Sequence, residues 1–233
     1  MSPAIFFDSG PIISLTIARL TWILPELKKH FNGPFYITPA VHYELIERPL
    51  QIRRFEFEAL QVMKLVRQGT LQVYTKVPTR KVKELTKLVN NTISLNGKNI
   101  DIMQEGEMQS IACVLENPGS VLAMDERTLR ALVEDQTSLL SLLTARFQKE
   151  VVPDKQQLQK CNDTFKNVNI IRSTELVAIA YSLGLLKDFV PPQKDGAEVL
   201  LDAVFWAVKY GGCAITGQEI EQLKLEILKK SKN

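Results

Sequence analysis

The feature that most constrains the fold is an alternation of short apolar runs with helical patterns. The apolar runs cover residues 4–7, 35–38, 120–125 and 168–173. Each is the length of a buried strand, and each is followed by apolar residues at helical spacing. Strands that alternate with helices pair in parallel and are covered on both faces. The pattern therefore predicts an α/β fold with three layers, α/β/α, around a mostly parallel central sheet.

Two of the predicted helices have clear boundaries. Thr38 can cap a helix that starts at Pro39, and Pro49 ends it. The stretch GEMQSIACVLENPG places apolar residues on one helical face and stops at Asn-Pro-Gly. These signals place the helices directly after the second strand and before the third.

Four other segments fit the alternation less simply. Residues 55–76 and 80–91 are interpreted as helix-rich connections with basic, solvated faces. Residues 135–166 separate two strands expected to be neighbours, and we interpret them as a helical insertion. Residues 191–233 predict a C-terminal extension with two helices. The whole chain, 1–233, is thus expected to form a single domain.

Composition excludes several classes of protein. The 29 basic and 26 acidic residues nearly balance, so a polybasic nucleic-acid-binding surface is not indicated. Cys113, Cys161 and Cys213 lack the spacing of a zinc site or a disulfide framework. No signal-like segment or membrane-spanning apolar run is present. We therefore expect a cytoplasmic protein that does not enter a membrane.

Four acids occupy positions at which an active site can form. Asp8 and Asp125 follow the first and third strands, and carboxyl ends of parallel strands share one edge of a sheet. Glu44 borders an apolar helical stripe, and Glu107 lies in the first turn of its helix. Brought together without bases, four carboxylates would repel one another unless a divalent cation bound them. Oxygen-only ligands point to Mg²⁺ or Mn²⁺.

Each acid also has a simple structural explanation. Asp8 could form a turn or a helix cap, and Asp125 could cap the helix that follows it. Glu44 could be a solvated helix residue, and Glu107 could interact only with the positive end of its helix. What favours a shared site is the occurrence of all four acids in order, each at a suitable place on its element.

Other enzyme chemistries fit the sequence poorly. A phosphatase of the haloacid dehalogenase type needs a second acid two positions after Asp8, where this chain has Gly10. No glycine-rich turn is followed by Lys and Ser or Thr, so a nucleotide-binding P-loop is not indicated. His30 and His42 are the only histidines, which leaves few ways to build a histidine-based catalytic site.

The motifs IFFDSGPIISL, ITPAVHYELIERP, EGEMQSIACVLEN, VLAMDERTLRALV and IIRSTELVAIAYSLGLL together resemble the PIN domain, a metal-dependent ribonuclease fold. The resemblance covers most of residues 4–186. It implies hydrolysis of RNA phosphodiester bonds with Mg²⁺ or Mn²⁺. Position by position it implies an acidic metal-binding set, which comprises Asp8, Glu44, Glu107 and Asp125. It also suggests Ser9 and Ser173 as substrate-binding residues. The substrate backbone could be contacted by Arg127, Arg130 or Arg172, of which Arg127 is the predicted substrate-binding residue.

The insertion at 135–166 departs from the PIN pattern, in which the fourth motif runs almost directly into the last strand. This departure leaves the substrate and the partner open. Two alternatives to the nuclease also stay open: a non-catalytic RNA-binding or scaffold module, and the toxin of a toxin–antitoxin pair with a small antitoxin-like partner. The retained acids count against the first, and the length and the insertion count against the second. The apolar stretches 139–143 and 199–208 suggest a homodimer, unless they cover the protein's own core.

Overall fold

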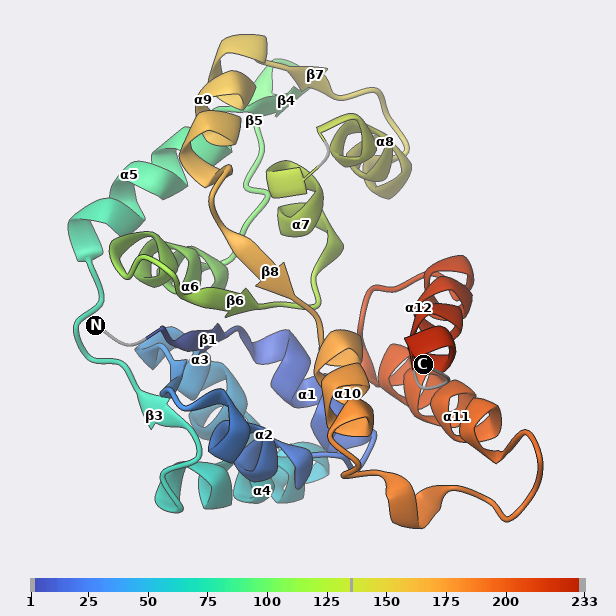
Figure 1. The fold of residues 1–233 in the computed structure, drawn as a ribbon. Coiled ribbons are helices and arrows are strands. Elements are labelled where there is room, and N and C mark those ends of the chain that lie inside the picture. The colour runs from blue at the N-terminus through green and yellow to red at the C-terminus, as the bar shows by residue number, and fades with distance from the viewer. Residues whose placement is uncertain (1–2, 135, 231–233) are drawn as a thin grey trace.

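The central sheet has five parallel strands in the order β3-β2-β1-β6-β8 (Figure 1). The computed structural model describes residues 3–134 and 136–230. The strands are β1 Ile5–Phe7, β2 Phe35–Ile37, β3 Gln72–Val73, β6 Val121–Ala123 and β8 Asn169–Ile171. Four of them lie within the predicted apolar runs. The fifth, β3, pairs with β2 at the sheet edge, within a connection that we expected to be helix-rich.

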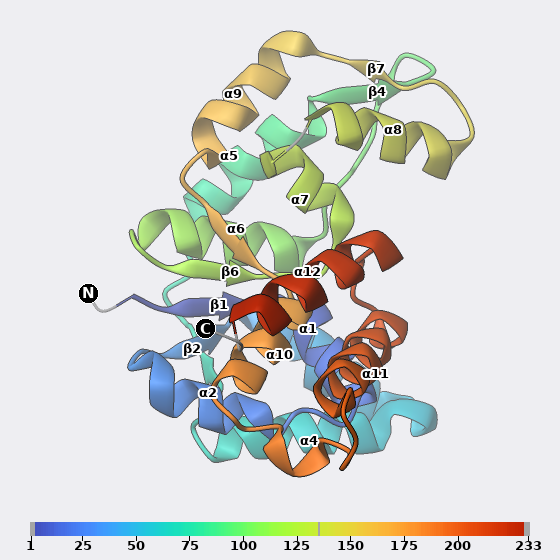
Figure 2. The same cartoon turned by 45° about the vertical axis from the view of Figure 1, so that its right-hand side comes forward.

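Helices cover both faces of this sheet, which gives the predicted three-layer α/β/α fold (Figure 1). The first layer contains α1 Ser9–Ile17, α2 Ile23–Phe31, α3 Pro39–His42, α4 Glu56–Arg67 and α10 Ser173–Ser182. The second contains α5 Thr79–Asn90, α6 Glu105–Glu116, α7 Arg127–Glu134, α8 Gln136–Phe147 and α9 Lys155–Phe165. The C-terminal pair, α11 Gly196–Gly211 and α12 Gly217–Lys230, lies beside α10 and α1 (Figure 2).

Alternation along the strands divides the core into two clusters. In β1, Ile5 and Phe7 pack with the first helix layer, whereas Phe6 packs with the second. Leu122 and Ala123 of β6 divide in the same way. Because side chains alternate across a strand, a sheet covered on both faces needs apolar residues at every position. This is why the strands read as uninterrupted apolar runs in the sequence.

The expected helical insertion contains a strand as well as helices. Within it, β7 Val152–Pro153 joins β4 Ile93–Leu95, which also pairs with β5 Lys98–Asn99, in a small antiparallel sheet. Asn96 and Gly97 join β4 to β5 with φ values of 51° and 75°. Two successive positive φ values match the tight hairpin turn that Asn-Gly favours. Asp135, the first residue of the expected insertion, lies outside the described residues.

The C-terminal extension forms two helices as predicted, and its residues 231–233 lie outside the described part. The apolar stretches that suggested a homodimer mostly serve the protein's own core. Leu139 and Leu143 are buried in the second cluster, and Leu201 and Phe205 are buried in the first. These side chains therefore supply no argument for a partner, and the homodimer stays a prediction. Among the described helices, none combines the length and the apolar character needed to cross a membrane.

Candidate functional site

The four predicted acids lie where strands of the central sheet end. Asp8 follows β1 and caps α1, and Asp125 lies two residues beyond β6, the neighbour of β1 in the sheet. Glu107 lies in the first turn of α6. Glu44 lies in a π-helical turn, Tyr43–Glu47, that continues α3. Such turns are uncommon and often occur at functional sites.

Two glycines allow the acids to approach one another. A Cβ atom at Gly106 would lie 2.9 Å from Oε1 of Glu44, so this side chain lies against the start of α6. A Cβ atom at Gly10 would lie 3.2 Å from Cβ of Asp125 and 3.5 Å from Oδ2 of Asp8. A side chain at Gly106 would displace the carboxylate of Glu44, and one at Gly10 would press on Cβ of Asp125.

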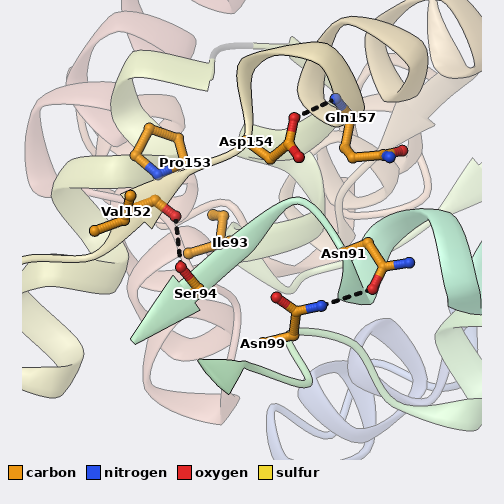
Figure 3. A pocket seen from close by; sticks show the side chains of 8 residues that line it. All are labelled: Asn91, Ile93, Ser94, Asn99, Val152, Pro153, Asp154 and Gln157. Atoms are coloured by element: carbon orange, nitrogen blue, oxygen red, sulfur yellow. Dashed lines mark hydrogen bonds between the residues drawn. The ribbon is translucent and has the colours of Figure 1, made fainter. Parts of the chain in front are cut away.

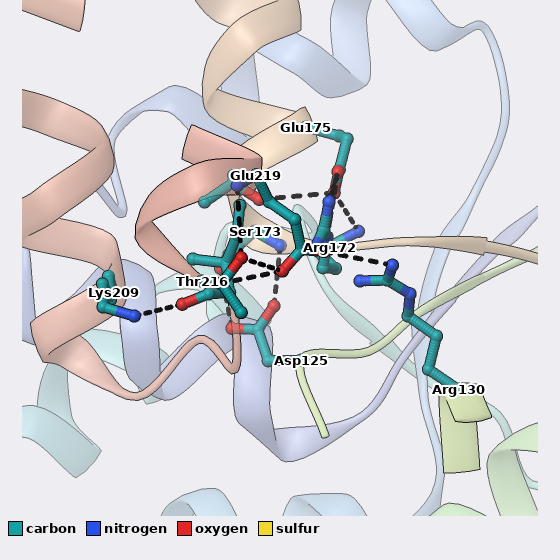
Figure 4. Close-up of polar contacts among 10 residues, drawn as sticks. Asp125, Arg130, Arg172, Ser173, Glu175, Lys209, Thr216 and Glu219 are labelled. Carbon is teal, nitrogen blue, oxygen red and sulfur yellow. Dashed lines mark hydrogen bonds and ion pairs between the residues drawn. The ribbon is translucent and has the colours of Figure 1, made fainter. Parts of the chain in front are cut away.

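Hydrogen bonds fix the carboxylate of Asp125 from two helices. The hydroxyl of Ser14 in α1 donates to Oδ2 at 2.6 Å. At the start of α10, Ser173 donates to Oδ2 from its hydroxyl at 2.7 Å and to Oδ1 from its amide at 2.8 Å (Figure 4). Bonds to a charged acceptor are stronger than neutral ones. Both oxygens of Asp125 are therefore held in place by the protein.

The C-terminal extension also holds Asp125 in place. The amide of Ala214 donates to the backbone oxygen of Asp125 at 3.2 Å. A Cβ atom at Gly211 would lie 2.6 Å from the backbone oxygen of Ser14, so α11 packs on α1 at close range. The extension is thus joined to both Asp125 and one of its hydrogen-bond donors.

Asp8 and Glu107 are buried acids with raised pKa values. Only 4% of Asp8 and 8% of Glu107 is exposed. Burial is the main cause that raises the pKa of Asp8 to about 6, and the charges of Glu44 and Asp125 add to it. Burial likewise raises the pKa of Glu107 to about 8, with contributions from Asp8 and Glu44. Glu44, Glu107 and Asp125 therefore all lie within electrostatic reach of Asp8.

This set of side chains has the donor chemistry of a magnesium or manganese site but not a finished geometry. No ion pair within residues 3–134 and 136–230 joins any of the four carboxylates to a base. Oxygen ligands, negative charge and the lack of a base suit a hard divalent cation. However, no three acid, histidine or cysteine side chains in the described part converge closely enough to hold a metal. One carboxylate oxygen of the set already has a protein partner, since Oε2 of Glu107 accepts a hydrogen bond from the amide of Gln104 at 2.8 Å.

The three other predicted site residues lie in different surroundings. Ser9 is half-buried at the start of α1, next to Asp8. Arg127 is exposed at the start of α7, two residues beyond Asp125. Ser173 is fully buried against Asp125, so its position suits holding this carboxylate more than contacting a substrate.

The sequence analysis did not identify Ser14 or the ion-pair network that joins Glu219 to Arg172 and Arg130. Glu219 in α12 accepts from Arg172 at 2.7 Å and from Arg130 at 3.3 Å (Figure 4). Burial opposes its ionisation, but hydrogen bonds from Thr216 and Arg172 lower the pKa of Glu219 to about 2. A polar residue within the apolar run PIISL was the one available signal for Ser14. The network joins residues far apart in sequence, so no local pattern marks it.

A cavity of about 520 Å³ lies over the small antiparallel sheet, apart from the acids (Figure 3). Its lining consists of Asn91, Ile93, Ser94, Asn99, Val152, Pro153, Asp154 and Gln157. None of the predicted site residues takes part in it. The acids at the carboxyl edge of the central sheet are therefore the candidate site.

Comparisons with known proteins bear on this site in one way. A family model described as a PIN domain matches residues 4–137, just over half of the chain. The match includes all four acids and stops before β8 and the C-terminal extension. No protein of curated function and no solved structure matches the chain.

Proposed function

Since the chain belongs to the PIN-domain family, we propose that it is a metal-dependent nuclease that hydrolyses phosphodiester bonds in RNA. The observation that carries this proposal is the group of base-free acids at the carboxyl edge of the sheet. Asp8, Glu107 and Asp125 are at most 8% exposed, and two of them have raised pKa values. Burying like charges is costly, and a bound cation offsets that cost.

In this proposal, Asp8, Glu44, Glu107 and Asp125 hold one or two Mg²⁺ or Mn²⁺ ions. When bound, such a cation supplies an activated water and stabilises negative charge on the attacked phosphate. Ser14 and Ser173 hold both oxygens of Asp125 so that this ligand needs little reorganisation. Asp8 retains a proton at near-neutral pH more readily than an ordinary aspartate, and it gives up that proton when it becomes a ligand. No side chain of the protein has to act as the nucleophile.

The test is cleavage of a labelled single-stranded RNA in Mg²⁺, in Mn²⁺ and in EDTA. The wild type should cleave with either cation and not in EDTA. Asp8→Asn should lower the rate about a hundredfold or more, because an electrostatic group at the reacting centre is lost. Glu116→Gln is the matched control, since Glu116 is an exposed acid of α6. Cleavage in EDTA, or equal rates in Asp8→Asn and Glu116→Gln, would contradict the proposal.

A second candidate function is RNA binding without cleavage. It is favoured by one observation, that the acids of the described residues do not converge into a ready metal site. A wild-type protein that binds the same RNA but leaves it intact in both cations would support this function instead.

A further inference from the structure

A cavity of about 210 Å³ lies between α7, α8 and the start of α12. Its lining consists of Arg127, Arg130, Ala131, Ser138, Leu142, Ala214 and Glu219. Two observations place the cavity next to Asp125. Arg127 is only two residues beyond Asp125, and the amide of Ala214 donates to the backbone oxygen of Asp125 at 3.2 Å.

The two arginines of the cavity have different surroundings. Arg130 is held by Glu219, with Nη2 at 3.3 Å from Oε1. Arg127 is exposed, and no ion pair or hydrogen bond of its guanidinium occurs in the described part of the chain. The guanidinium of Arg127 is therefore available to a ligand, whereas the guanidinium of Arg130 is held in one orientation by Glu219.

Among the described lining residues the one acid is Glu219, and its carboxylate already has partners. Oε2 of Glu219 accepts from the amide and the hydroxyl of Thr216, both at 2.8 Å, and Oε1 accepts from Arg172 at 2.7 Å. Oε1 of Glu219 is thus shared between Arg172 and Arg130, and the described lining residues include two guanidinium groups and one carboxylate. A cavity with two guanidinium groups suits an anion with several oxygens.

We propose that this cavity is a subsite for a backbone phosphate of the substrate strand, a short distance along the strand from the scissile bond. The proposal rests on the proposed nuclease function for the identity of the strand. Arg127 binds the phosphate directly, and Arg130 is oriented toward it by Glu219. Ala214 and Glu219 lie outside the family match, so the C-terminal extension completes a substrate site that the matched region alone does not contain.

Phosphate contacts position a strand without reading its bases or its sugars. The subsite should therefore contribute equally to binding of RNA and of single-stranded DNA with the same sequence. Any preference of the enzyme for RNA must come from other contacts, because only the 2′-hydroxyl distinguishes the two strands at a given position.

The test measures binding of a labelled 12-nucleotide single-stranded RNA in EDTA by fluorescence anisotropy, at several salt concentrations. EDTA removes cleavage from the measurement, so the result does not depend on whether the nuclease proposal is correct. Arg127→Gln should weaken binding about tenfold and reduce the slope of log K against log salt by about 1. Arg127→Lys should keep the salt slope, because it keeps the charge. Arg80→Gln, at an exposed arginine of α5, removes the same charge elsewhere and should keep both affinity and slope.

Equal affinity for Arg127→Gln and Arg80→Gln would overturn the subsite, as would a wild type that binds no RNA. An effect of Arg127→Gln on RNA but not on the DNA of the same sequence would also overturn it, because a phosphate contact acts on both. Failure of the nuclease proposal has a different signature: the wild type would bind RNA with the Arg127 dependence described above and would leave it intact in Mn²⁺.

Discussion

The acids at the carboxyl edge of the central sheet, here called the acidic edge, fall into two groups that the protein holds in opposite ways. Asp125 forms one side of the edge, and Asp8 and Glu107 form the other. On one side, Asp125 receives three hydrogen bonds from Ser14 and Ser173, and its backbone is tied to the C-terminal extension. On the other, Asp8 and Glu107 each receive a backbone hydrogen bond and face like charges without a base. The difference fits the proposed cation site, in which the protein itself would fix Asp125 and a bound cation would organise Asp8 and Glu107.

The largest expected effect compares the two aspartates directly. Asp8→Asn and Asp125→Asn should both lower the cleavage rate about a hundredfold or more, because each removes a ligand. Only Asp125→Asn should also destabilise the fold, by about 1–3 kcal/mol, since it disturbs buried hydrogen bonds. Asp8→Asn should leave stability level or raise it, because a buried like charge is lost. Initial rates and urea midpoints of both variants check this, and equal midpoints would remove the distinction between the two sides.

A smaller effect is expected at one donor to Asp125. Ser14→Ala leaves a buried carboxylate oxygen with one donor fewer and should cost about 1–3 kcal/mol of unfolding free energy. Ser110→Ala is the matched control, because Ser110 is also a fully buried helical serine but its hydroxyl has no partner among the described residues. This control should be neutral or slightly stabilising. Equal urea midpoints for the two variants would show that the Ser14 bond does not support the site.

The pH dependence of the stability of the metal-free protein should report on Asp8 and Glu107. Folding raises the pKa of Asp8 to about 6 and that of Glu107 to about 8, from ordinary values near 4. The folded state therefore binds more protons than the unfolded state in this range, and stability falls as the pH rises. The urea midpoint in EDTA should decrease between about pH 4 and 8. In Asp8→Asn, the decrease of the midpoint below about pH 6 should be smaller than in the wild type. A midpoint that rises over this range in the wild type would have the wrong sign.

The smallest effect is expected at an acid that is not part of the candidate site. Glu116 is exposed near the end of α6, so Glu116→Gln should change stability by less than about 0.5 kcal/mol and leave the cleavage rate unchanged. A large effect on either quantity would mean that negative charge in general, and not the acids at the sheet edge, matters for the protein.

The sequence predicted the parts of the molecule that local patterns determine. Four strands with apolar residues on both faces were visible as runs such as AIFF, and Asp8 and Asp125 could be placed at their ends. Strand β3 and the small antiparallel sheet were missed, because each of their strands, with the sequences QV, ISL, KN and VP, contains a polar residue or proline. The Asn96-Gly97 hairpin was a usable signal that the sequence interpretation overlooked.

The support of Asp125 could not be predicted, because it depends on packing between distant segments. Ser14, Ser173 and Ala214 lie more than 45 residues from Asp125 in the sequence yet contact it in the fold. For the same reason, the insertion and the extension looked like additions to the domain. In the structure, the extension contacts Asp125 through the amide of Ala214, and Glu219 binds Arg172, the residue before Ser173.

The central claim is that the Asp8 side of the edge is a site for a divalent cation, and a melting experiment with Mn²⁺ tests it most directly. Ligands that bind the folded state raise the melting temperature by mass action. Millimolar Mn²⁺ should raise the melting temperature of the wild type and of Glu116→Gln equally, and it should have little effect on Asp8→Asn. If Mn²⁺ shifts all three proteins by the same amount, or shifts none of them, the acids at the sheet edge do not form a metal site.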